Sequence, residues 1–119
     1  MLAAYLRREA APSERIFTEN QYAQLCTAFY VVGPLWLYQV MEKVGAPARD
    51  FPNLEGQIER LQWSWKPGTR AWLVLAGQPE APALRQWAQT FPRIDFPKSE
   101  GAQLRLLDPA LRERALGPR

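Results

Sequence analysis

The sequence predicts an α+β fold: an N-terminal helical half packed on a small antiparallel β-hairpin sheet, with two further short helices in the C-terminal half. A chain of 119 residues fits one domain and can bury roughly two-thirds of its unfolded surface. Apolar residues make up 47% of the chain, which is typical of globular proteins. Apolar spacing is helical in the first half and strand-like near residues 62–76.

We therefore expect one domain over residues 1–119, without a linker or an internal repeat. Its expected parts are a helical region at about 1–61, a hairpin at about 62–76, a helix at about 82–91, and a short strand with a capped helix at about 102–116. Eleven prolines punctuate these elements.

The first half begins with a short helix over residues 1–11. Thr18 and Gln21 fit a capping box, which predicts that a second helix begins there. Its apolar residues at i, i+3, i+4 and i+7 are predicted to face the core: Tyr22, Leu25, Cys26 and Phe29. Pro34 then interrupts the helix, because proline lacks an amide donor, and a further helix is expected over residues 34–44.

Residues 20–41 contain no charged side chain. A membrane span needs about 20 predominantly apolar residues, and the apolar part of this segment is shorter, so we do not expect it to span a membrane. A pair of core helices is favoured, with Phe29, Leu37 and Val40 facing inward. Aromatic residues on its flanks are the candidate interface for a protein partner or a second copy: Tyr30, Trp36 and Tyr38.

Asn53 is predicted to cap a short helix that places Leu54, Ile58 and Leu61 on one face. Glu55 and Glu59 lie on a nearby face, and we interpret them as solvated residues because no ligating partner follows at a useful spacing.

The hairpin is predicted from the alternation around Trp63 and Trp65, the turn at Pro67 and Gly68, and the apolar strand 71–76. Trp63 and Trp65 would then share one strand face. Neither face of residues 71–76 is polar, which predicts a strand covered on both sides.

The remaining elements follow from local signals. Apolar spacing predicts a helix with Leu84, Trp87, Ala88 and Phe91 on one face, and Gln103–Leu107 is expected to add a strand. Asp108 before Pro109 is a helix-opening signal, and Gly117 before Pro118 is a stop signal.

The residue inventory argues against enzymatic chemistry. The sequence has no histidine, so the commonest general base and zinc ligand are missing. Cys26, the single cysteine, is interpreted as a small core residue rather than a nucleophile. No phosphate-cradling glycine motif occurs, and the carboxylates Asp95, Glu100 and Asp108 follow no paired spacing. We expect no catalytic residue, no metal and no cofactor.

One cysteine permits no intrachain disulfide, and the N-terminus lacks the order of a secretory signal, so a cytoplasmic protein is expected. The first 60 residues carry six basic and seven acidic side chains, whereas residues 61–119 carry nine and five. The positive charge therefore lies in the second half, where it would favour an anion or an acidic partner.

Three hypotheses about function follow. The favoured one is a small non-enzymatic binding protein (an accessory subunit, adaptor or inhibitor) that acts through aromatic contacts. The alternative is a nucleic-acid-binding module, built either like a winged helix or on a basic aromatic surface. That surface would contain Trp63, Trp65, Lys66, Arg70, Arg105, Arg112 and Arg114. A second alternative is membrane association through Tyr22 to Met41.

Overall fold

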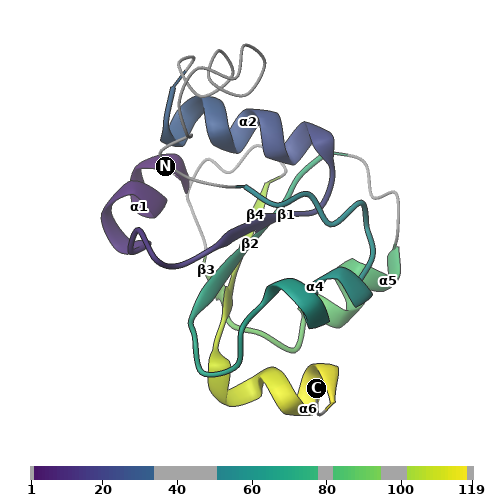
Figure 1. Ribbon diagram of the computed structural model, residues 1–119. Coiled ribbons are helices and arrows are strands. Elements are labelled where there is room, and N and C mark those ends of the chain that lie inside the picture. The colour runs from purple at the N-terminus through teal and green to yellow at the C-terminus, as the bar shows by residue number, and fades with distance from the viewer. Residues whose placement is uncertain (1, 34–50, 78–81, 95–101, 118–119) are drawn as a thin grey trace.

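The computed structural model describes residues 2–33, 51–77, 82–94 and 102–117 (Figure 1). The α+β class is confirmed. In chain order the elements are α1 (Leu2–Glu9), β1 (Ile16–Thr18), α2 (Gln21–Val31), α4 (Glu59–Ser64), β2 (Ala71–Leu75), α5 (Pro82–Ala88), β3 (Arg93–Ile94), β4 (Gln103–Leu107), the 3-10 helix η1 (Pro109–Leu111) and α6 (Arg112–Leu116).

These strands form a four-stranded mixed sheet in the order β1-β2-β4-β3. β1 and β2 are parallel, with Phe17 opposite Leu73, and β4 runs antiparallel to both β2 and β3. A parallel pair needs a long crossover, and residues 19–70 supply it. The expected hairpin sheet is therefore wrong, because the neighbours of β2 are distant in the sequence.

The first strand of that hairpin is replaced by helix α4. Ile58, Leu61 and Trp65 stand at i, i+3 and i+7, and this helical spacing outweighs the local alternation around the tryptophans. Trp63 lies within α4, whereas Trp65 is its C-cap with extended backbone, and the two side chains differ in burial: Trp63 is 73% exposed and Trp65 only 1%. The predicted shared face of Trp63 and Trp65 does not exist.

Two hydrophobic cores lie on the two faces of the sheet. α1 and α2 cover one face with Leu6, Ala23 and Ala28, whereas α4, α5 and α6 cover the other (Figure 1). All five residues of β2 are buried and alternate between the cores: Trp72 and Val74 face the first, and Ala71, Leu73 and Leu75 face the second. The prediction of a strand covered on both sides is confirmed.

α2 begins at Gln21, later than the predicted start at Thr18, which is instead the last residue of β1. Asn20, not Thr18, is the N-cap, and its Oδ1 accepts a hydrogen bond from the Ala23 amide at 2.8 Å. Its buried residues are small ones, Ala23, Thr27 and Ala28. Small side chains let a helix lie close to a sheet, and this close packing leaves the larger side chains of α2 outside the core.

The predictions for residues 82–117 are largely confirmed. β4 spans Gln103–Leu107, and the Asp108 side chain accepts from the Ala110 amide at 3.0 Å to cap η1 and α6. α5 ends at Ala88, although Phe91 still packs in the core.

Asn53 was wrongly expected to start a helix: its side chain accepts from the Glu55 amide and closes a turn, and α4 begins only at Glu59.

Several predictions fall on residues 34–50 and 95–101, which lie outside the described parts of the chain. They concern the helix over residues 34–44 and the residues Trp36, Leu37, Tyr38, Val40, Asp95 and Glu100. Among the described residues, none of the helices has the length and apolar character required to cross a membrane.

Candidate functional site

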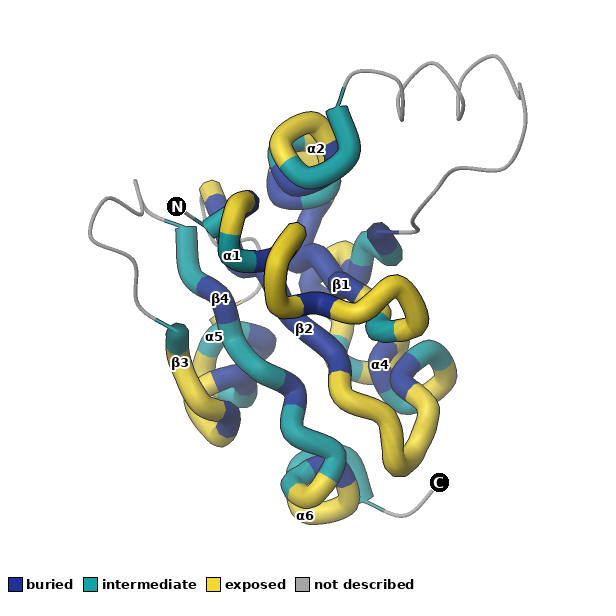
Figure 2. The backbone as a smooth tube through the Cα atoms, turned by 90° about the vertical axis from the view of Figure 1, so that its left-hand side faces the viewer, coloured by how far each residue is buried: buried dark blue, intermediate teal, exposed yellow. Residues whose placement is uncertain are grey.

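Four large apolar side chains of α2 point away from the sheet, and we name them the α2 outer face. Their exposed fractions are 61% for Tyr22, 41% for Leu25, 54% for Phe29 and 58% for Tyr30. The spacing i, i+3, i+7 and i+8 places them on one side of the helix. Figure 2 shows exposed positions of α2 on the side opposite β1. Tyr22, Leu25 and Phe29, which were predicted to be buried, are therefore solvent-exposed.

The α2 outer face carries no charge, since α2 contains neither acidic nor basic residues. Phe29 and Tyr30 contact each other edge to face, with ring centroids 5.3 Å apart. An aromatic side chain presents about 200 Å² in total, so the face exposes about 400 Å² of mostly apolar surface. Apolar patches of this size on a monomer often have a function.

Hydrogen bonds at both of its flanks fix α2 on the domain. The Asn20 side chain donates to the Ala76 carbonyl at 3.1 Å, and the Gln24 side chain donates to the Phe51 carbonyl at 2.8 Å. Gly77, at a φ of +75°, lies against the Tyr22 ring, and a Cβ at this position would lie 3.1 Å from Tyr22 Cδ1. The α2 outer face is therefore presented on a preorganised helix, which lowers the entropy cost of binding.

A buried ion pair between Glu19 and Arg85 lies next to the N-cap of α2. Glu19 is fully buried, and its carboxylate accepts two hydrogen bonds from Arg85, at 2.9 Å from Nε and at 2.8 Å from Nη2. These bonds raise the pKa of Arg85 above its ordinary value, although burial opposes them. Arg85 also donates to the Gly77 carbonyl at 2.9 Å. We interpret this pair as a structural support, because its hydrogen-bonding groups are used within the fold.

The residues predicted to form a nucleic-acid surface do not lie on one surface. Trp65 and Arg112 are buried, and the Arg112 guanidinium lies 5.7 Å from the centre of the Trp65 ring. Arg112 donates to the carbonyls of Trp65 and Gln62 at 3.0 and 3.3 Å, so it caps the C-terminal end of α4. Both residues belong to the core and cannot take part in a binding surface.

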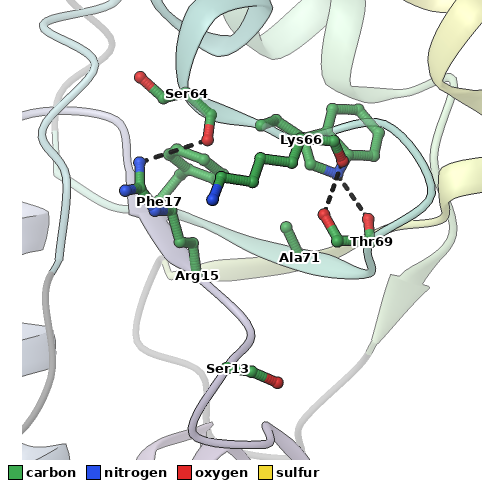
Figure 3. Close-up of a pocket in the computed structure, with 8 residues that line it drawn as sticks. Ser13, Arg15, Phe17, Ser64, Lys66, Thr69 and Ala71 are labelled. Atoms are coloured by element: carbon green, nitrogen blue, oxygen red, sulfur yellow. Dashed lines mark hydrogen bonds between the residues drawn. The ribbon is translucent and has the colours of Figure 1, made fainter.

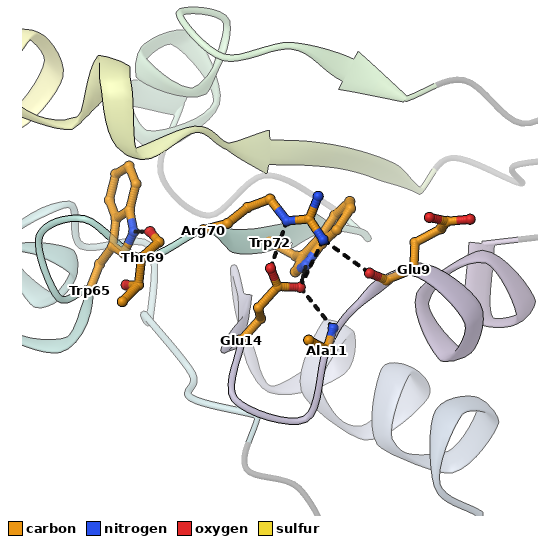
Figure 4. A network of polar contacts seen from close by, with 7 residues as sticks. All are labelled: Glu9, Ala11, Glu14, Trp65, Thr69, Arg70 and Trp72. Carbon is orange, nitrogen blue, oxygen red and sulfur yellow. Dashed lines mark hydrogen bonds and ion pairs between the residues drawn. The ribbon is translucent and has the colours of Figure 1, made fainter.

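Of the other predicted residues, Arg70 and Arg105 serve internal contacts. Arg105 is half-buried and donates to the Phe91 carbonyl at 2.9 Å. Arg70 is exposed but forms an ion pair with Glu14, whose Oε2 lies 2.6 Å from Nε (Figure 4). The other three of the seven are exposed: Trp63, Lys66 and Arg114.

Glu14 links the N-terminal segment to β2. Its carboxylate accepts hydrogen bonds from Arg70, from the Ala11 amide at 2.7 Å and from Trp72 Nε1 at 3.2 Å, as Figure 4 shows. Burial alone would raise the pKa of Glu14, but these hydrogen bonds outweigh it and hold the pKa below its usual value. Arg70 also lies 5.1 Å above the centre of the Trp72 ring.

A small pocket of about 80 Å³ opens at the amino ends of β1 and β2. Figure 3 shows the Arg15 guanidinium and the extended Lys66 side chain on the same side of the pocket, near Phe17. Arg15 Nη1 donates to the Ser64 carbonyl at 3.3 Å. The lining residues include no carboxylate: they are Ser13, Arg15, Phe17, Ser64, Trp65, Lys66, Thr69 and Ala71.

The sequence alone did not indicate this pocket, because Arg15 and Lys66 are far apart in the chain. Only the parallel pairing of β1 with β2 brings their loops together.

In the described parts of the chain, no group of three or more histidine, cysteine, aspartate or glutamate residues could hold a metal ion. Comparisons with family models, with curated proteins and with solved structures find no significant match.

Proposed function

We propose that the protein is a small non-enzymatic binding component, such as an accessory subunit, adaptor or inhibitor, that docks a protein partner on the α2 outer face. The exposure of Tyr22, Leu25, Phe29 and Tyr30 on one uncharged side of a single helix carries this proposal. A surface helix with no partner normally presents polar residues on its outer side.

Aromatic residues support a protein partner in particular. Tyrosine and phenylalanine are enriched at the buried centres of interfaces, where a few such side chains supply most of the binding energy. The α2 outer face contains three of them beside Leu25. Its area of about 400 Å² is half of the roughly 800 Å² that one partner contributes to a standard interface. It therefore fits the apolar centre of an interface, whose rim needs additional residues.

The non-enzymatic part of the proposal is supported by the residue inventory. The sequence offers no histidine, and Cys26 is a half-buried residue on α2. Nucleophilic cysteines normally need a nearby base or cation to form the thiolate.

Site-specific photo-crosslinking tests the proposal. A benzophenone amino acid replaces Phe29 in the α2 outer face and, in a matched control, Trp63, an exposed aromatic residue on α4. We expect position 29 to give a discrete cross-linked species in cells of the source organism, and position 63 to give none of this mass. Mass spectrometry of the linked peptide identifies the partner as another protein or as a second copy.

Leu25→Glu provides the second control. Leu25 is 41% exposed, so a charge at this position leaves the fold intact, which thermal unfolding checks, but it disrupts an apolar interface. The cross-link from position 29 should disappear in this background. Equal cross-linking from positions 29 and 63, or cross-linking that persists with Leu25→Glu, would contradict the proposal.

A further inference from the structure

We infer that the pocket between Arg15 and Lys66 binds a dianionic phosphate group, either free inorganic phosphate or the phosphate of a small monoester. The pocket is distinct from the α2 outer face. Phe17, Trp65 and Ala71, which line it, belong to the core on the opposite side of the sheet from α2.

The first argument is uncompensated charge. Among the described residues, four other arginines form ion pairs with glutamates: Arg8, Arg60, Arg70 and Arg85. Arg15 and Lys66 are exposed at the pocket, and neither has a carboxylate at ion-pair distance within the same described ranges. Glu14, the neighbour of Arg15 in the sequence, is directed to Arg70 instead. Two cations at one pocket without an anion form a site for a negatively charged ligand.

The second argument is the set of hydrogen-bond donors. Arg15 uses one N–H on the Ser64 carbonyl, and its guanidinium retains others; Lys66 carries three donors on its ammonium group. Ser13 and Ser64 also line the pocket. A guanidinium together with an ammonium group is a combination that recognises phosphate oxygens well.

The third argument is size and surroundings. A pocket of about 80 Å³ is several times larger than the roughly 10–15 Å³ that one water molecule needs. Phe17 and Ala71 contribute apolar atoms to its lining. Two positive charges match a phosphate monoester, which carries about −1.5 to −2 at pH 7, better than a diester with one charge.

The competing explanation is that both cations only stabilise the C-terminal end of α4. Arg112 already caps this end with two hydrogen bonds, and α4 has only six residues. The two explanations differ in their observable consequences: a purely structural role changes thermal stability, whereas a binding role changes phosphate affinity.

The test is a titration of the isotope-labelled protein followed by amide chemical shifts, at constant ionic strength. The probes are inorganic phosphate, phosphoserine as a monoester, dimethyl phosphate as a diester and an eight-residue oligothymidine. We expect saturable shifts around Arg15, Ser64 and Lys66 with the first two probes, and much weaker shifts with the diester. Arg15→Gln and Lys66→Gln should each weaken binding at least about tenfold, which is about 1.4 kcal/mol, since each removes a charge-assisted hydrogen bond.

Arg7→Gln is the matched control. It removes the same charge from an exposed position on α1 and should leave phosphate binding unchanged. Absence of saturable shifts with both phosphate and phosphoserine would overturn the inference. So would an equal loss in Arg7→Gln, or binding of the oligonucleotide alone, which would instead indicate a nucleic-acid surface. Leu25→Glu should retain phosphate binding, so the outcome is independent of the protein-binding proposal.

Discussion

The ion pair between Glu19 and Arg85 should be one of the largest single polar contributions to stability. Glu19 is fully buried and Arg85 is 22% exposed. Replacing Glu19 with glutamine leaves the guanidinium without its counter-charge in a mostly buried setting. Breaking a buried pair typically costs 3–5 kcal/mol, and the solvent access of Arg85 places the expected cost near the lower limit, at about 3 kcal/mol.

This loss is large for a domain whose total stability is of the order of 5–15 kcal/mol. Urea unfolding followed by tryptophan fluorescence measures it for Glu19→Gln, Arg85→Met and the double variant. The sum of the two single-variant losses in unfolding free energy should exceed the loss in the double variant by at least about 1 kcal/mol, because both single substitutions remove the same interaction. A cost below about 1 kcal/mol for Glu19→Gln, or additive losses, would refute the reasoning.

Three further predictions concern other contacts. The lowered pKa of Glu14 means that its stabilising effect is present above its ordinary pKa of 4.5 and is lost as pH falls through the lower folded-state value. Unfolding midpoints should therefore show a gap between wild type and Glu14→Gln that narrows below pH 4.5; a constant gap would contradict this. Gly77→Ala should lower stability by more than about 1 kcal/mol in thermal unfolding, because of its positive φ and the nearby Tyr22 ring, and an unchanged Tm would contradict this, since the strain of the positive φ remains even if the ring moves. Trp65→Ala should cost about 3–5 kcal/mol and Trp63→Ala less than about 0.5 kcal/mol in urea unfolding, and similar costs would contradict their opposite burial.

The elements that the sequence predicted well depend on local signals. The uninterrupted apolar run gave β2, and the Asp108 cap with Pro109 gave the start of the C-terminal helices. In both cases the neighbouring residues determine the local structure, since side-chain polarity and proline geometry act within a few positions.

The failures have a tertiary origin. Alternation around Trp63 competed with the helical spacing of Leu61 and Trp65, and packing of Trp65 against Phe91 and Arg112 favours the helix. The small residues of α2 pack against the sheet and thereby determine which side of the helix is buried. Apolar spacing alone does not predict this orientation. The exposed apolar residues that carry the proposed function were therefore assigned to the core.

The candidate sites were only partly predictable for the same reason. Tyr30 was expected to be exposed and is exposed, because it lies on the same side of α2 as Tyr22 and Phe29, facing away from the sheet. Arg15 was not identified as a site residue, since its partner Lys66 approaches only through the pairing of β1 with β2.

The most direct test of the central claim is the affinity of the cross-linked partner for purified wild type, Phe29→Ala and Trp63→Ala. Calorimetry measures it for another protein, and sedimentation equilibrium measures it for a second copy. We predict that Phe29→Ala weakens the complex at least about tenfold, as expected for an aromatic residue at the centre of an interface, whereas Trp63→Ala leaves it unchanged. An affinity that Phe29→Ala leaves unchanged would contradict docking on the α2 outer face.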